Sequence, residues 1–197
     1  DILGCGRYKK ERLMAGHLYL HVGPPKSGTT SLQYAIEKIE HPGLVYGGVY
    51  QPRGRNIGSL ANRLYQGLMA QENNLLQNAK EEVRHLVCQG NQVVISEEMI
   101  LLTQRKKDWK AKLTQLRELF EDIPTTVVIS LRDPMEGLPS LYQQLYNELP
   151  LHHRLSFTQF CKSDIASCYD YSLVRTVLAA LGYENIHFLS FDAIRRG

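Results

Sequence analysis

The stretch HVGPPKSGTTS, residues 21–31, decides the fold class of this chain. It follows a short apolar run at residues 18–20 and precedes a segment with the apolar spacing of a helix. A glycine-bounded loop between a strand and a helix is a common phosphate site. Its backbone N–H groups point inward, and the helix N-terminus adds partial positive charge. We therefore expect residues 21–31 to bind an anion at the end of a buried strand.

The details of this loop separate it from an ATP-binding loop. Gly23 and Gly28 have the G-x-x-x-x-G spacing of a P-loop, in which a lysine and then Ser or Thr should follow the second glycine. Here Thr29 follows Gly28, and the lysine lies inside the loop as Lys26. The spacing thus predicts an anion site that differs from the nucleotide-kinase pattern.

A second stretch, residues 126–134, is also typical of a strand that ends at a binding site. Residues 126–131 are rich in β-branched side chains without alternation, which is typical of a buried parallel strand. The strand ends in Arg132-Asp133-Pro134, and Ser140 follows eight residues after the arginine on a helix-like segment. On its own, this pattern would equally fit a turn with a surface arginine.

Taken together and in this order, the two motifs resemble those of the PAPS-dependent sulfotransferase family, where PAPS is 3′-phosphoadenosine 5′-phosphosulfate. The resemblance covers residues 18–194, although residues 42–91 match only in outline. It implies that the first motif binds the 5′-phosphosulfate and the second the 3′-phosphate, without a metal. The implied donor-binding residues are Lys26, Ser27, Gly28, Thr29, Thr30, Arg132 and Ser140.

The chain departs from the family pattern at the second motif. Relatives often carry a second arginine five residues after the first, where this chain has Gly137, and Pro139 beside Ser140 is unusual. Pro is tolerated in the first turn of a helix, where we expect Pro139 to lie. Donor affinity would be lower than usual unless another basic residue substitutes.

The catalytic residues implied by the resemblance are Lys26, which would reach the bridging oxygen of the donor, and a general base. Relatives use His or Glu as this base. Here Ser96-Glu97-Glu98 follows a short apolar strand that we expect beside the phosphate loop, the glycine-bounded segment at residues 23–28. Alternation across the strand puts one of the two carboxylates in the cleft, and we favour Glu98 over Glu97. A competing interpretation is that Ser96 caps a helix and both glutamates favour its dipole. His21 is assigned no role.

The order of the expected elements predicts an α/β fold, with a mainly parallel sheet flanked by helices, like that of the P-loop nucleoside triphosphate hydrolases. We expect residues 1–16 to be an N-terminal extension or a remnant of trimming. The resemblance implies that residues 17–197 form a sulfotransferase-like domain without the C-terminal part of the family. Strands are expected at residues 18–22, 92–95, 126–131 and 185–190, and a loop at 41–58. Helices are expected at residues 29–39, 59–70, 74–88, around 109–120, 137–148, 157–166 and 171–181.

Composition narrows the possible partners. A net charge of +3 over 197 residues suits an anionic substrate but argues against nucleic acid. No apolar run is long enough to span a membrane. The four cysteines show no zinc spacing, and Cys88 is expected to be a buried thiol, so we expect no metal site. The cysteines also lack a dense disulfide pattern, and no Asn-x-Ser/Thr glycosylation acceptor occurs. Both observations favour a cytoplasmic location.

The function predicted from the sequence is transfer of the sulfuryl group of PAPS to a hydroxyl of a small molecule, carbohydrate or lipid, with PAP as the product. Two alternatives remain open at this point. One is a Mg²⁺-dependent kinase that uses ATP with a degenerate P-loop. The other is a catalytically impaired domain that binds PAP or PAPS, which Gly137 motivates.

Overall fold

The computed structural model describes residues 16–48, 58–104, 107–148 and 154–192, and it is an α/β structure built on one five-stranded sheet. Its strands all pair in parallel, and their spatial order is β2-β3-β1-β4-β5. The strands are β1 (His17–Val22), β2 (Leu44–Tyr46), β3 (Gln92–Ser96), β4 (Thr125–Leu131) and β5 (Asn185–Ser190). The strand β1, the loop after it and helix α1 form the arrangement of P-loop proteins, as the sequence predicted.

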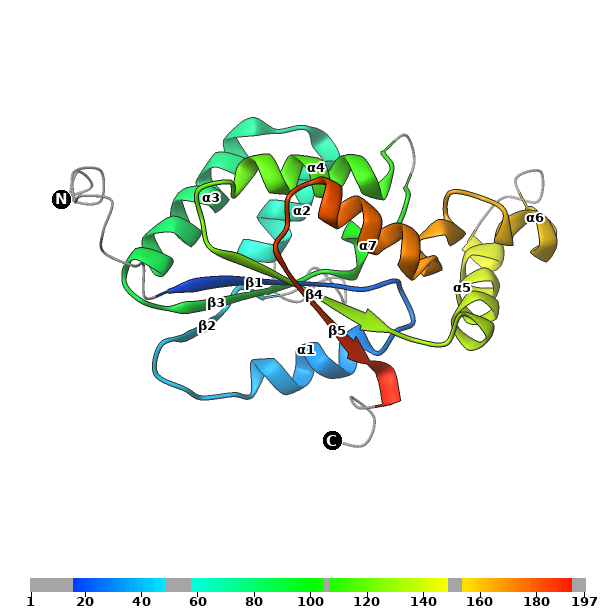
Figure 1. Cartoon of the computed structure of the whole chain (residues 1–197), viewed down its shortest axis with the longest axis horizontal. Helices are drawn as coiled ribbons and strands as arrows, with labels where there is room; N and C mark the ends of the chain where they lie inside the picture. Colours follow the sequence, from blue (N-terminus) through cyan, green and yellow to red (C-terminus); the bar gives the residue numbers. More distant parts are fainter. Residues whose placement is uncertain (1–15, 49–57, 105–106, 149–153, 193–197) are drawn as a thin grey trace.

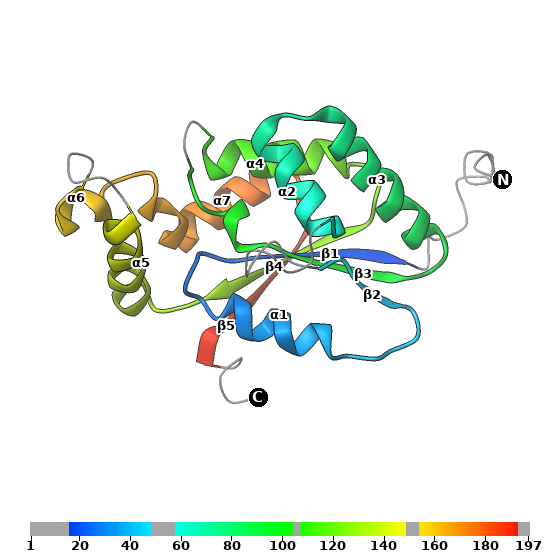
Figure 2. The ribbon, with the colours of Figure 1, turned by 180° about the vertical axis from the view of Figure 1, so that it is seen from behind.

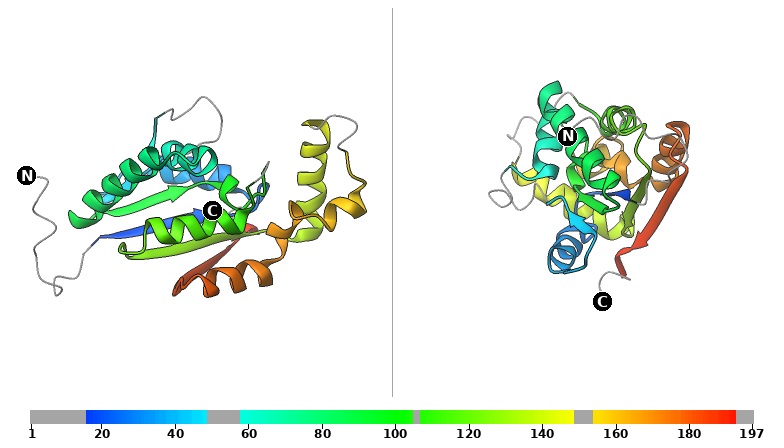
Figure 3. Two further views of the ribbon diagram at one scale, coloured as in Figure 1. Left: turned by 90° about the horizontal axis from the view of Figure 1, so that it is seen from above. Right: turned by 90° about the vertical axis from the view of Figure 1, so that its left-hand side faces the viewer.

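The helices cover the sheet unevenly. They are α1 (Thr29–Glu37), α2 (Leu60–Ala70), α3 (Asn73–Cys88), α4 (Trp109–Leu119), α5 (Pro134–Glu148), α6 (Phe157–Cys161) and α7 (Tyr171–Ala180), with short 3₁₀ helices η1 (Glu98–Ile100) and η3 (Ala166–Tyr169). Helices α2, α3, α4 and α7 lie on one face, and α1 lies on the other (Figures 1 and 2). Helices α5 and α6 stand beyond the carboxyl ends of the strands (Figure 3).

The core lies between the sheet and the four-helix face. The stripe on α4 that includes Trp109, Leu113 and Leu116 is buried there. The expectation of a buried Cys88 thiol is wrong, because this residue is exposed. The buried stripe of α3 runs through Leu76, Ala79, Val83 and Val87, and Cys88 lies one position beyond it.

Helix α1 also differs from expectation. It ends at Glu37, two residues earlier than predicted. Its apolar residues Leu32, Ala35 and Ile36 have the spacing of one helix face, and Ile39 continues that spacing, yet Ile39 is 53% exposed and Ala35 is exposed too. The buried positions are Thr29 and Gln33. Figure 3 shows why part of α1 is exposed. Among the described helices, α1 alone lies on its face of the sheet, so no other helix covers the side of α1 that points away from the sheet.

Residues 41–58 are not entirely a loop, because β2 lies within them and pairs with β3. Three residues between Gly43 and Gly47 are too few to show a strand pattern in the sequence. Residues 49–57 of the expected loop lie outside the described residues, as do residues 1–15 of the N-terminal extension. Of the charged residues at 105–107 the structure describes Lys107, whose Nζ donates to the Leu68 carbonyl and to Gln115 Oε1.

The segment after β4 begins its helix earlier than predicted. Helix α5 starts at Pro134, and the Asp133 carboxylate accepts from the N–H of Met135, 2.8 Å away. Pro139 therefore lies in the second turn, inside the helix, and not in the first. The expected helix over 157–166 is also shorter, since α6 ends at Cys161 and η3 follows.

Among the described residues, no helix has the length and apolar character needed to cross a membrane.

Candidate functional site

The loop between β1 and α1 turns its carbonyl oxygens towards the protein. The Pro24 carbonyl accepts from both the N–H and the hydroxyl of Ser27, at 3.3 and 2.7 Å. The Pro25 carbonyl accepts from the Tyr169 hydroxyl at 2.6 Å. These bonds hold residues 24–27 against the body of the molecule, and they use Ser27 for the turn itself.

The other side of the loop presents N–H groups. Gly28 adopts a positive φ of 80° at the N-cap of α1, and no side chain caps this helix. The first N–H groups of a helix have no acceptor within it, so those of Thr29 and Thr30 remain available to an anion. Gly28 is required twice over, because a Cβ there would also lie 2.6 Å from the Phe191 ring.

An open cavity of about 420 Å³ lies over this helix end. Six of the predicted site residues line it: Lys26, Gly28, Thr29, Thr30, Glu98 and Arg132. The lining is completed by Pro25, Ser31, Tyr34, Gln144 and Phe191. The two sequence motifs and the strand that ends at residue 96 therefore meet in one place, at the carboxyl ends of β1, β3 and β4.

Two predicted donor-binding residues do not line the cavity. Ser27 is fully buried, and its hydroxyl and N–H both point to the Pro24 carbonyl. Ser140 is partly buried on α5, and Gln144, one turn later on the same face, lines the cavity instead.

The two candidate bases are separated clearly. Glu97 is 1% exposed, and its carboxylate accepts from the N–H of Met99 at 2.9 Å, which caps η1. The Glu98 carboxylate lines the cavity and accepts from the Thr29 hydroxyl. Burial raises the pKa of Glu98, while the Thr29 hydrogen bond and the charge of Lys26 oppose the rise. The cap of η1 is thus Glu97 and not Ser96 as the competing interpretation had it, whereas the position of a base at the cavity fits Glu98.

Lys112, which the sequence analysis did not single out, holds the 3₁₀ helix that carries Glu98. This ammonium is fully buried and donates to the carbonyls of Met99 and Leu102, each at 2.6 Å. Burial lowers the pKa of Lys112 to about 8. A lysine within the apolar stripe of α4 was the available signal.

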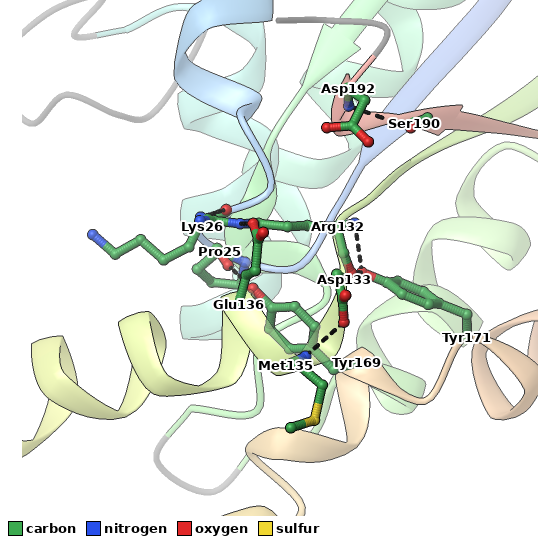
Figure 4. A network of polar contacts seen from close by, with 10 residues as sticks. All are labelled: Pro25, Lys26, Arg132, Asp133, Met135, Glu136, Tyr169, Tyr171, Ser190 and Asp192. Atoms are coloured by element: carbon green, nitrogen blue, oxygen red, sulfur yellow. Dashed lines mark hydrogen bonds and ion pairs between the residues drawn. The ribbon is translucent and has the colours of Figure 1, made fainter.

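Arg132 connects the second motif to the first. Its Nη1 donates to the Lys26 carbonyl at 2.7 Å, its Nε lies 3.5 Å from the Glu136 carboxylate, and its guanidinium lies 5.0 Å from the centre of the Phe191 ring. Figure 4 shows Arg132 reaching across to the loop, while the Lys26 side chain extends away from it. One edge of the guanidinium thus holds the loop beside the cavity that it lines.

Tyr169 and Tyr171 support both motifs from η3 and the start of α7. The Tyr171 hydroxyl accepts from the N–H of Arg132 at 2.9 Å and donates to its carbonyl at 2.8 Å (Figure 4). Tyr169 reaches Pro25 across α5 only because residue 137 is glycine, since a Cβ there would lie 2.3 Å from its ring. The missing side chain at Gly137 thus leaves the space that lets Tyr169 hold the loop.

We expect Gly137→Ala to destabilise the protein by about 1–3 kcal/mol, because it overpacks a buried contact. It should also break the bond between Tyr169 and Pro25. Chemical denaturation measures the first effect. Met135→Ala, on the same helix but at an 81% exposed position, is the control and should change the stability by less than about 0.5 kcal/mol. An equal loss in both variants would contradict the steric argument.

No family model and no curated protein matches the sequence. Among solved structures, the chain is similar to one described as "Crystal structure of APE1195", with 16% identity and a TM-score of 0.40 over 86% of this chain and 98% of that one. At such values the fold assignment rests on the strand order and directions given above.

Proposed function

We propose that the protein is a sulfotransferase that moves the sulfuryl group of PAPS to an acceptor hydroxyl. The observation that carries the proposal is the meeting of Lys26, the uncapped end of α1, Glu98 and Arg132 around one cavity. A cavity of this size is within the range that holds a nucleotide-sized ligand. Anion-binding groups and a partly buried carboxylate in the same cavity are what sulfuryl transfer requires.

The residues fit the donor in separate parts. The N–H groups of Gly28, Thr29 and Thr30 suit its 5′-phosphate, as in other anion sites at helix ends. The guanidinium of Arg132 suits the 3′-phosphate, because its planar fork matches phosphate oxygens. With Nη1 bonded to the Lys26 carbonyl and Nε beside the Glu136 carboxylate, Nη2 would take this second phosphate.

In the reaction that we propose, the acceptor oxygen attacks the sulfur in line, a new O–S bond forms, and the S–O bond to the 5′-phosphate breaks. Glu98 takes the proton of the acceptor hydroxyl. Negative charge develops on the leaving 5′-phosphate, where Lys26 and the N–H groups at the start of α1 stabilise it. PAP leaves with that charge.

We expect Arg132→Ala to weaken PAP binding by about 10- to 100-fold, since a charge-assisted hydrogen bond contributes roughly 1.5–3 kcal/mol. Isothermal titration measures this. Adenosine 5′-phosphate, which lacks the 3′-phosphate, should bind the wild type weakly and the variant about equally weakly. Arg132→Lys keeps the charge but loses the fork, so it should recover only part of the affinity.

This design separates two roles of Arg132. If the guanidinium only holds the loop through the Lys26 carbonyl, both ligands lose affinity by the same factor. A wild-type protein that does not distinguish PAP from adenosine 5′-phosphate would contradict the proposed function. Tighter binding of ATP, dependent on Mg²⁺, would favour the kinase alternative instead.

A further inference from the structure

A buried histidine bridges three strands directly beneath the phosphate loop. His21 of β1 is 2% exposed, and the Ser96 and Ser130 side chains on β3 and β4 are fully buried. The Nδ1 atom of His21 lies 2.7 Å from Ser96 Oγ, and its Nε2 atom lies 2.6 Å from Ser130 Oγ. One imidazole therefore joins the carboxyl ends of the strands on both sides of β1.

The partners give the bridge a direction. Gln33 of α1 approaches both the carbonyl and the hydroxyl of Ser96, at 3.4 and 3.1 Å. A carbonyl oxygen only accepts, so Gln33 presents its NH₂ group here and donates to the Ser96 hydroxyl as well. The Ser96 hydrogen then points to Nδ1 of His21, and the Nε2–H group donates to Ser130. A neutral imidazole has the one acceptor and the one donor that this series of hydrogen bonds needs.

The bridged serines occupy equivalent places relative to the site. Glu98 lies two residues after Ser96, and Arg132 lies two residues after Ser130. Ser130 also lies close to the loop, because a Cβ on Gly23 would approach its Cβ to 3.0 Å. The distance between the two serines therefore affects the distance between the base at one side of the cavity and the guanidinium at the other.

We propose that His21 is a positioning residue, whose bridge between Ser96 and Ser130 fixes Glu98 and Arg132 at their working separation across the phosphate loop. This inference rests on the proposed function for the roles of Glu98 and Arg132. Apolar side chains of similar shape would fill the same space at nearly equal stability. What the polar bridge adds is a fixed geometry between three strand ends. Burial lowers the pKa of His21 to about 4, so the ring stays neutral and the bridge intact near neutral pH.

The test removes the two arms of the bridge separately. Ser130→Ala should reduce the preference for PAP over adenosine 5′-phosphate by about 3- to 10-fold, which corresponds to one net hydrogen bond. Ser96→Ala should leave PAP affinity unchanged. It should instead lower the rate of PAP release from PAPS, with water as the acceptor, and shift the acidic limb of its pH profile. His21→Phe should show both effects, and adding either serine variant to it should cause little further change.

The chain provides a matched control at the other end of the same strands. His17 of β1 lies 2.7 Å from Thr126 Oγ1 of β4, so His17→Phe also removes a bond between an imidazole and a hydroxyl, but at the opposite sheet edge. It should leave both readouts unchanged. His21→Gln retains a donor and an acceptor and should recover part of both. If His21→Phe only lowers the melting temperature and keeps wild-type PAP preference and PAP release, the bridge is purely structural and the inference fails.

A further readout needs no ligand. NMR of the imidazole nitrogens should show His21 neutral at pH 6 and protonated at Nε2. A charged ring at that pH would overturn the bridge. Wild-type protein that binds PAP no better than adenosine 5′-phosphate would instead overturn the proposed function, while the nitrogen spectrum would still decide whether the bridge exists.

Discussion

Replacing Glu98 by Gln should reduce the rate of the sulfuryl transfer that we propose by about 10²- to 10⁴-fold, the usual contribution of a general base. Affinity for PAP should change little, because the amide keeps the shape and can still accept from Thr29. The measurement is PAP release from PAPS, with water and with a panel of sugar hydroxyls as acceptors. Glu97→Gln is the matched control. Its amide oxygen can still cap η1 at Met99, so the rate should stay near that of the wild type.

The pH profile gives a second check on Glu98. Because burial raises the pKa of this carboxyl, kcat/KM should fall as the pH falls through a midpoint above the ordinary glutamate value of about 4.3. Thr29→Val removes the hydrogen bond that lowers the pKa, so it should move the midpoint to higher pH. A profile that is flat in acid, or equal losses in the Glu97 and Glu98 variants, would exclude Glu98 as the base.

Replacing Lys26 by Met should slow transfer by about 10²- to 10³-fold, comparable to the loss of one donor that stabilises transition-state charge. Lys26 is the exposed residue of the loop, and its side chain extends away from Arg132 (Figure 4). Stopped-flow measurement of a single turnover isolates this step from product release. Removing the charge that lowers the pKa of Glu98 should also shift the acidic limb of the profile upward.

Lys38→Met provides the control for the Lys26 variant, because it removes the same charge from the exposed far end of α1. It should leave the single-turnover rate unchanged. Similar losses in the two variants would mean that the net charge of the molecule matters rather than the position of Lys26. A Lys26→Met protein with a wild-type rate would rule out its role at the leaving group.

The sequence predicted the parts of the fold that repeat a regular pattern. The strands that end at Val22 and Leu131 were placed to within a residue, because buried parallel strands are mostly apolar. The strand Asn185–Ser190 was also placed correctly, although most of its residues are exposed. The meeting of Lys26 and Arg132 also followed from the sequence, since neighbouring parallel strands end at the same edge. Such patterns do not show which distant segments pack against each face of a helix or strand.

The missed features depend on contacts between segments far apart in the chain. Gly137 looked like a missing arginine, and only the position of Tyr169 explains it. The apolar residues of α1 favour burial of the helix face that carries them. Their spacing does not show whether another element covers that face, and part of it is exposed. Lys112 reaches the carbonyls below Glu98 through the core, and nothing in its local sequence shows where those carbonyls lie.

The carbonyl bonds of the phosphate loop have a consequence for the speed of binding. With Pro24, Pro25 and Lys26 all accepting from protein donors, the loop is ordered during folding and not by its ligand. A preorganised site loses little conformational entropy when it is occupied. Capture of a dianion should then approach the rate of electrostatically steered encounter and slow steeply as salt is added.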